Sequence, residues 1–131
     1  MTNVSRNRPL SPHLTVWRPT ITYVMSIVHR ITGVALYAGT LLVAAWLIAA
    51  ASGPESFERV NALFGSLIGR LVLLGYTWAL MHHMLGGLRH LVWDTGRGLG
   101  KYESRKFGWA TIAGSVTLTI LIWIAGFALR S

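Results

Sequence analysis

The sequence has 131 residues, of which 53% are hydrophobic and only 12% are charged, and its mean hydropathy is +0.50. A soluble domain of this length carries fewer apolar and more charged residues, so membrane insertion is the first hypothesis. Cysteine is absent, which excludes disulfides and thiolate-bound metals. The net charge of +8 comes from twelve Lys and Arg residues that gather at the ends of apolar segments, and this distribution argues against nucleic-acid binding.

The first twenty residues, MTNVSRNRPLSPHLTVWRPT, contain two Arg-Pro pairs and no apolar core. A secretory signal peptide needs such a core, and a mitochondrial transit peptide needs a long amphipathic helix that proline would interrupt. We therefore expect no cleaved targeting segment of either kind.

Three apolar segments follow in chain order. Residues 31 to 51 carry no charge and can cross a hydrocarbon core of about 30 Å as a helix, which we extend back to Thr22. The second segment covers about 63 to 91, and the third covers 107 to 129. Because no internal repeat is present, we expect residues 1 to 131 to form one all-α integral membrane domain with three transmembrane helices, at about 22–51, 63–91 and 107–129.

The charges outside these spans predict the orientation. Residues 1 to 30 carry four arginines and no acidic residue, and residues 86 to 106 carry five basic residues against two acidic ones. The loop after the first span carries two glutamates and one arginine. The positive-inside rule therefore puts the N-terminus inside and the C-terminus outside.

With this topology, the start of the first span and the end of the second lie at a similar depth. In the first span, Ser26, His29 and Arg30 have the spacing i, i+3, i+4, so they share a helix face and could contact one ligand. The alternative is that Arg30 reaches lipid headgroups and His29 only marks the interface.

In the second span, His83, Gly87, His90 and Asp94 form a stripe on one helix face. A glycine between two histidines would let a flat macrocycle approach the backbone, with one imidazole as an iron ligand, although small residues in membranes also serve close helix packing. His83 and His90 are about 10 Å apart along the axis, so one straight helix supplies one axial ligand.

A second stripe contains His82, Gly86, Arg89 and Trp93, so spacing alone leaves His82 and His83 as competing ligands. Asp94 could accept a hydrogen bond from a histidine, but we expect it to form an ion pair with Arg89 or Arg97.

Two motifs, one in the first span and one in the second, resemble those of the cytochrome b membrane-anchor subunit of succinate dehydrogenase, respiratory complex II. The first is RPLSPHLTVWRPTITYVMSIVHRIT, with Arg8-Pro9-Leu10 followed by Ser26, His29-Arg30 and Thr32. The second runs from His83 through Gly87-Leu88-Arg89-His90 to Trp93-Asp94 and Gly96. With the three spans, the resemblance covers nearly the whole chain.

The resemblance implies a haem b with His83 as one axial ligand and the other supplied by a second small membrane subunit. It implies that His29, Arg30 and, as a weaker inference, His90 lie near the haem propionates, and that Ser26 and Arg30 contribute to a ubiquinone site. Arginine suits carboxylates, serine can donate to a quinone carbonyl, and a neutral imidazole can ligate iron.

The resemblance also implies the partners and the place of the chain. The partners are the second membrane subunit, an iron–sulfur subunit, a flavoprotein subunit and the lipid bilayer. We expect no nucleic acid among the partners. The chain would act only as a subunit of succinate dehydrogenase, with no catalytic residue of its own, in the inner (cytoplasmic) membrane of a bacterium rather than in a mitochondrion.

Two alternatives remain open from the sequence. One is an anchor that binds quinone but no haem, which visible absorption would distinguish. The other is a small membrane scaffold or proton-relay subunit, since three spans with intramembrane histidines permit either role.

Overall fold

The computed structural model describes residues 9–129. Arg6 and Arg8, which contribute to the predicted inner charge and to the first motif, lie outside the described residues. A short 3-10 turn, η2 (His13–Val16), precedes four helices: α1 (Ile21–Ala51), α2 (Pro54–Gly65), α3 (Leu67–Asp94) and α4 (Lys101–Ala128). Residues 9–129 contain no strand, and α1, α3 and α4 are long and apolar enough to cross a membrane. The prediction of an all-α chain with three membrane-spanning helices is confirmed, and the orientation of its termini stays a prediction.

The second apolar region begins differently from the expected span at 63–91. Residues 54–65 form the separate helix α2, which begins at Pro54 in its first turn and is preceded by Gly53, with φ 112°, at the N-cap. At Ser66 the backbone becomes extended, and the Ser66 hydroxyl caps α3 by accepting from the Gly69 amide at 3.1 Å. Leu63 therefore belongs to the connecting helix, and α3 starts at Leu67.

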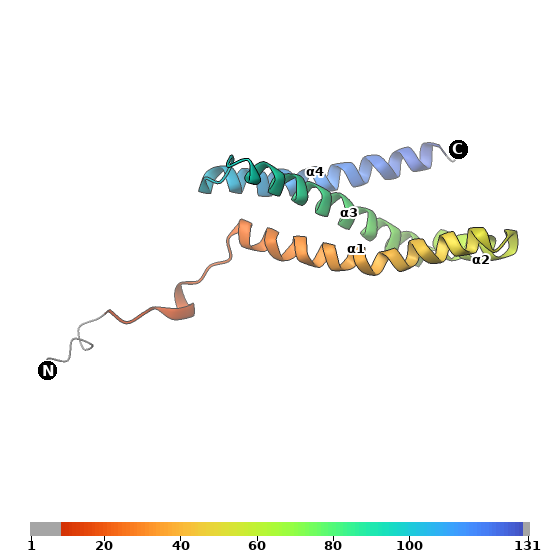
Figure 1. The fold of residues 1–131 in the computed structure, drawn as a ribbon, viewed down its shortest axis with the longest axis horizontal. Helices are drawn as coiled ribbons and strands as arrows, with labels where there is room; N and C mark the ends of the chain where they lie inside the picture. Colours follow the sequence, from red (N-terminus) through yellow and green to blue (C-terminus); the bar gives the residue numbers. More distant parts are fainter. Residues whose placement is uncertain (1–8, 130–131) are drawn as a thin grey trace.

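Helix α3 is the central element of the bundle. It packs against α4 on one side and α1 on the other, whereas the contact between α1 and α4 is smaller. Figure 1 shows that the start of α1, the end of α3 and the start of α4 lie at the same end of the helices. The two segments that carry the motifs are thus brought together, as the predicted topology requires.

The interior between the helices is small and largely polar. Among residues 9–129 the buried hydrophobic side chains are only Met25, Ala49 and Ala79. The buried polar side chains are Thr32, His82, Arg89, Thr111, Ser115 and Thr119. Hydroxyls on α4 bond within their own helix, as Thr111 does to the Phe107 carbonyl at 2.8 Å. Most large apolar side chains point outward, which suits contact with lipid or other membrane subunits.

Candidate functional site

Two histidines from α1 and α3 stack on each other. The ring centroids of His29 and His83 are 4.0 Å apart and their planes differ by 5°. The close approach depends on a glycine, because a Cβ on Gly86 would lie 2.4 Å from His29 Nδ1. That nitrogen is buried and has no hydrogen-bond partner among the described residues. The start of α1 and the end of α3 therefore share one imidazole-lined contact.

The backbone and a hydroxyl of α1 hold the ring of His83. Its Nδ1 lies 3.1 Å from the His29 carbonyl oxygen and 3.3 Å from the Thr32 hydroxyl. Since a carbonyl can only accept, Nδ1 carries the proton in this arrangement and Nε2 keeps its lone pair. A Cβ on Gly33 would lie 3.0 Å from His83 Cε1, so the ring rests directly on the α1 backbone.

His82, one position earlier, faces α4. It is 2% exposed, and its Nδ1 lies 3.2 Å from the Ser115 hydroxyl on α4. Trp78 covers it with a ring-centroid distance of 5.2 Å. Its Nε2 is buried without a partner among residues 9–129. The two adjacent histidines thus occupy different environments, one enclosed by α4 and the other half-buried against α1.

The two stripes on α3 correspond to two faces of the helix. His82, Gly86 and Arg89 are buried in the bundle, with the Arg89 guanidinium 4.9 Å from the centroid of the Trp93 ring. The stripe that begins at His83 is the open one: His83 and Gly87 are half-buried, and His90 and Asp94 are exposed. Apart from its chain neighbours and the adjacent backbone of α3, no atom of residues 9–129 lies within 4 Å of the position that a Cβ on Gly87 would take. Gly86 therefore serves helix packing, while Gly87 leaves space on the face of His83.

The other expected site residues lie around this contact. His90 is exposed, with its ring centroid 5.4 Å from that of His29. Ser26 is half-buried one turn before His29, and Arg30 is exposed. Within residues 9–129, neither the Ser26 hydroxyl nor the Arg30 guanidinium takes part in a hydrogen bond, so both remain available to groups from outside the chain.

The expected ion pair of Asp94 is wrong. The only salt bridge among the described residues joins Arg59 to Glu55 on α2, at 3.2 Å. Arg89 turns into the bundle and stacks on Trp93, whereas Asp94 ends α3 with its side chain exposed. One residue along a helix is a rotation of about 100°, which places Trp93 and Asp94 on different faces.

Sequence reasoning missed the residues that orient the two histidines. Ser115 and Thr32 are fully or almost fully buried and bond to His82 and His83, and Gly33 lies under the His83 ring. Hydroxyl and glycine residues are common in membrane helices, so only the motif position of Thr32, three residues after His29, marked any of them in the sequence.

Three long apolar helices with histidines grouped at one end define a membrane-embedded helical subunit with a candidate cofactor site. Residues 4–122 match the family model for the succinate dehydrogenase/fumarate reductase transmembrane subunit. A succinate dehydrogenase cytochrome b556 subunit from Paracoccus denitrificans is 46% identical over 128 residues, which cover 97% of this chain and 98% of that protein.

Further relatives extend the likeness. The cytochrome b556 subunit from Rickettsia conorii is 35% identical over 92% of this chain and 94% of its own length. The mitochondrial cytochrome b560 subunit from Sus scrofa is 42% identical over 74% of this chain and 59% of its own length. The chain belongs to the succinate dehydrogenase/fumarate reductase transmembrane subunit family, as a cytochrome b subunit of succinate dehydrogenase.

Proposed function

We propose that this chain anchors succinate dehydrogenase in the membrane, holds one haem b jointly with a second small membrane subunit, and contributes to the site where ubiquinone is reduced. His83 would be the axial ligand from this chain. The observation that carries the proposal is the hydrogen bond of His83 Nδ1 to the His29 carbonyl, because it orients the ring and leaves Nε2 as the metal-binding atom.

The donor set fits a haem better than a bare metal ion. No group of three or more His, Asp or Glu side chains in the described part of the chain could hold a metal alone. A haem iron needs only one protein ligand from each side, and the iron–ligand chemistry suits a neutral imidazole. When bound, the haem would supply a one-electron redox centre. His82 is a poorer candidate ligand, since Ser115 and Trp78 enclose it.

The polar residues near His83 would hold the haem propionates and the ubiquinone. His29, Arg30 and His90 surround the same end of α1 and α3 and would bind the haem propionates, as cationic or donor groups do with carboxylates. Ser26 and Arg30, whose polar atoms have no partner in the described residues, would donate to the ubiquinone carbonyl oxygens. Reduction of the quinone to the quinol would take two electrons from the iron–sulfur subunit and two protons from the adjacent aqueous face.

The proposal includes the remaining partners and the location. An iron–sulfur subunit would dock at the basic end of the helices, with a flavoprotein subunit beyond it, and the complex would lie in the inner membrane of a bacterium with the N-terminus of this chain inside. Names of the bacterial relatives and the positive-inside pattern support this placement.

The test compares His83→Ala with His82→Ala in the purified complex. A dithionite-reduced minus oxidised spectrum should contain a b-type signal in the parent and in His82→Ala, and should lose it in His83→Ala. The reverse ranking would move the ligand to His82. A complete complex without any b-type signal would instead support the haem-free quinone anchor or the scaffold and relay alternatives.

A further inference from the structure

A second cavity lies away from the histidines, between the start of α1 and the start of α4. Its volume is about 820 Å³. Its lining includes three cations, three hydroxyl residues and one indole: Arg18, Lys101, Arg105, Thr20, Thr22, Ser104 and Trp109. The starts of α1 and α4, which line the cavity, lie at the same end of the helices as the loop that follows α3 (Figure 1), and the positive-inside rule places the inner membrane surface there.

The charge of this cavity is uncompensated. Its lining contains no Asp or Glu, and none of the three cations takes part in a salt bridge among residues 9–129. The first turns of α1 and α4 both contribute to the wall, and helix N-termini carry partial positive charge. Three cations and three hydroxyl residues around one space suit an anion with several acceptor oxygens.

The cavity continues into an apolar surface. On α4, Lys101, Arg105 and Trp109 follow one another at intervals of four residues, so they lie on one face. Farther along that face, Val116 and Ile120 are exposed. The order of cation, then indole, then aliphatic side chain reproduces the order of headgroup, interface and acyl chains in a lipid leaflet.

We propose that this cavity binds the headgroup of an anionic phospholipid, with its phosphodiester among Arg18, Lys101 and Arg105 and an acyl chain along α4. The cations favour an anionic over a zwitterionic lipid. An acidic protein surface would also complement the cations, but it would leave Trp109 and Leu99, both more than half exposed, without an apolar partner. The site is separate from the proposed haem and quinone residues, so it stands or falls independently of them.

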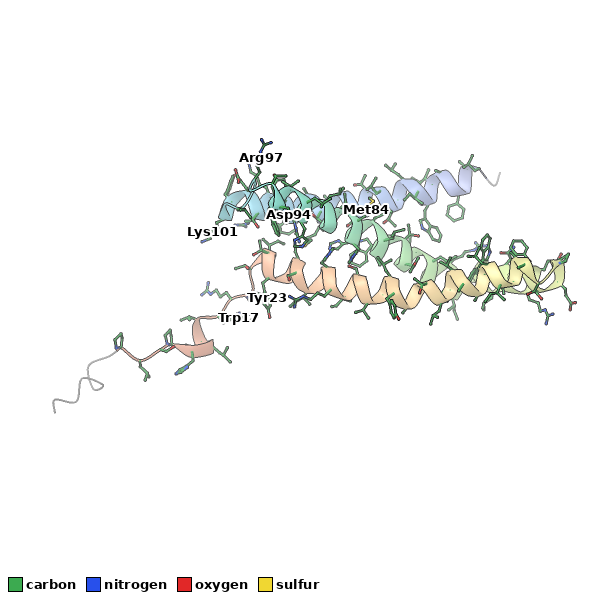
Figure 2. All side chains as sticks on the ribbon, in the orientation of Figure 1. Trp17, Tyr23, Met84, Asp94, Arg97 and Lys101 are labelled. Carbon is green, nitrogen blue, oxygen red and sulfur yellow. The ribbon has the colours of Figure 1, made fainter. Side chains whose placement is uncertain are left out.

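The test uses the complete complex, purified in detergent and depleted of lipid. Its melting temperature is followed while phosphatidylglycerol, phosphatidylcholine or inorganic phosphate is added in separate titrations, and native mass spectrometry counts the lipids retained. Three forms are compared: the parent, the double variant Lys101→Gln with Arg105→Gln, and Arg97→Gln. Arg97 is a matched control because it is an exposed cation of the loop before α4 and lies outside the cavity lining. Figure 2 shows Arg97 on the side away from α1 and Lys101 at the start of α4.

The parent should bind phosphatidylglycerol more tightly than phosphatidylcholine. A basic residue near a membrane surface contributes about a fivefold preference for anionic lipid, so the loss of two cations from the cavity should weaken phosphatidylglycerol binding about 25-fold. Arg97→Gln, which changes no residue of the cavity lining, should bind as the parent does. Equal binding by the double variant would overturn the proposal. Two other results would also overturn it: protection by inorganic phosphate equal to that by the lipid, or loss of the iron–sulfur subunit from the double variant in either lipid.

Discussion

His29 determines the position of His83 through two separate contacts, a ring face at 4.0 Å and a backbone carbonyl at 3.1 Å from Nδ1. The two residues are 54 positions apart in the chain, so packing of α1 on α3 fixes both the plane and the tautomer of the imidazole. A substitution that moves α1 relative to α3 should therefore change the orientation of the His83 ring, even where the substituted residue is far from that ring.

Gly86→Ala should disturb this contact, and Gly75→Ala should not. A Cβ at position 86 would lie 2.4 Å from His29 Nδ1, while a Cβ at position 75, farther from the histidines on the same helix, meets open space within 4 Å. Both substitutions remove a glycine from the same helix, so the change in helix propensity is matched. We expect Gly86→Ala to broaden or shift the b-type spectrum of the complex and Gly75→Ala to retain it. Identical spectra for the two variants would contradict the placement of His29.

Gly39→Ala should loosen the packing of α1 on α3. A Cβ there would lie within the ring of Tyr76, at 1.8 Å from Cε2. Overpacking of this kind typically costs about 1–3 kcal/mol. The matched control is Gly75→Ala, where no atom lies within 4 Å of the added carbon. The melting temperature of the complex should fall for Gly39→Ala alone, and a fall of similar size in both variants would mean that loss of glycine itself is responsible.

Ser115→Ala should destabilise the α3–α4 contact without removing the b-type signal. The substitution deletes the hydroxyl that lies 3.2 Å from His82 Nδ1 inside the bundle. Hydrogen bonds between membrane helices contribute about 0.6 kcal/mol on average and about 1.7 kcal/mol at most. Thermal unfolding of the complex measures the effect, with Thr117→Ala, an exposed position on the same helix, as the control. Loss of the b-type signal in Ser115→Ala would give the α4 side of α3 a direct part in haem binding.

Arg30→Ala should lower quinone reduction more than assembly. Arg30 is exposed on α1 and has no partner of its own within residues 9–129, so its removal leaves the packing of this chain intact. Loss of a hydrogen bond to a charged donor costs about 1.5–3 kcal/mol, which corresponds to about tenfold or more in rate. Quinone reductase activity should fall by that factor, while succinate oxidation with an artificial acceptor and the subunit content stay near the parent. Parallel loss of all three would assign Arg30 to assembly.

The three membrane spans could be predicted from the sequence, because an apolar segment of this length is typically a membrane-spanning helix. The sequence was also sufficient for the two stripes on α3, since the 3.6-residue period alone separates His82 from His83. It did not reveal that residues 54–65 form a separate helix, because Leu63 and Phe64 are as apolar as the span that follows and the boundary depends on the backbone at Ser66.

The environment of each histidine could not be predicted from the sequence. Which stripe faces the interior depends on Ser115, 33 positions away from His82, and on the packing of α1 against α3. Residue type and spacing describe a single helix, whereas the rotation of that helix is a property of its neighbours. The expected ion pair of Asp94 was wrong for the same reason, since Arg89 is turned into the bundle.

The central position of α3 has a consequence for biosynthesis. Of the three long helices it is the least apolar, and its buried His82 and Arg89 lie against α4, which is synthesised after it. On leaving the ribosome, α3 has no α4 to cover these groups, and polar residues exposed to lipid are costly. We expect α3 to remain in contact with the translocation machinery until α4 follows, so that the two enter the bilayer as a hairpin.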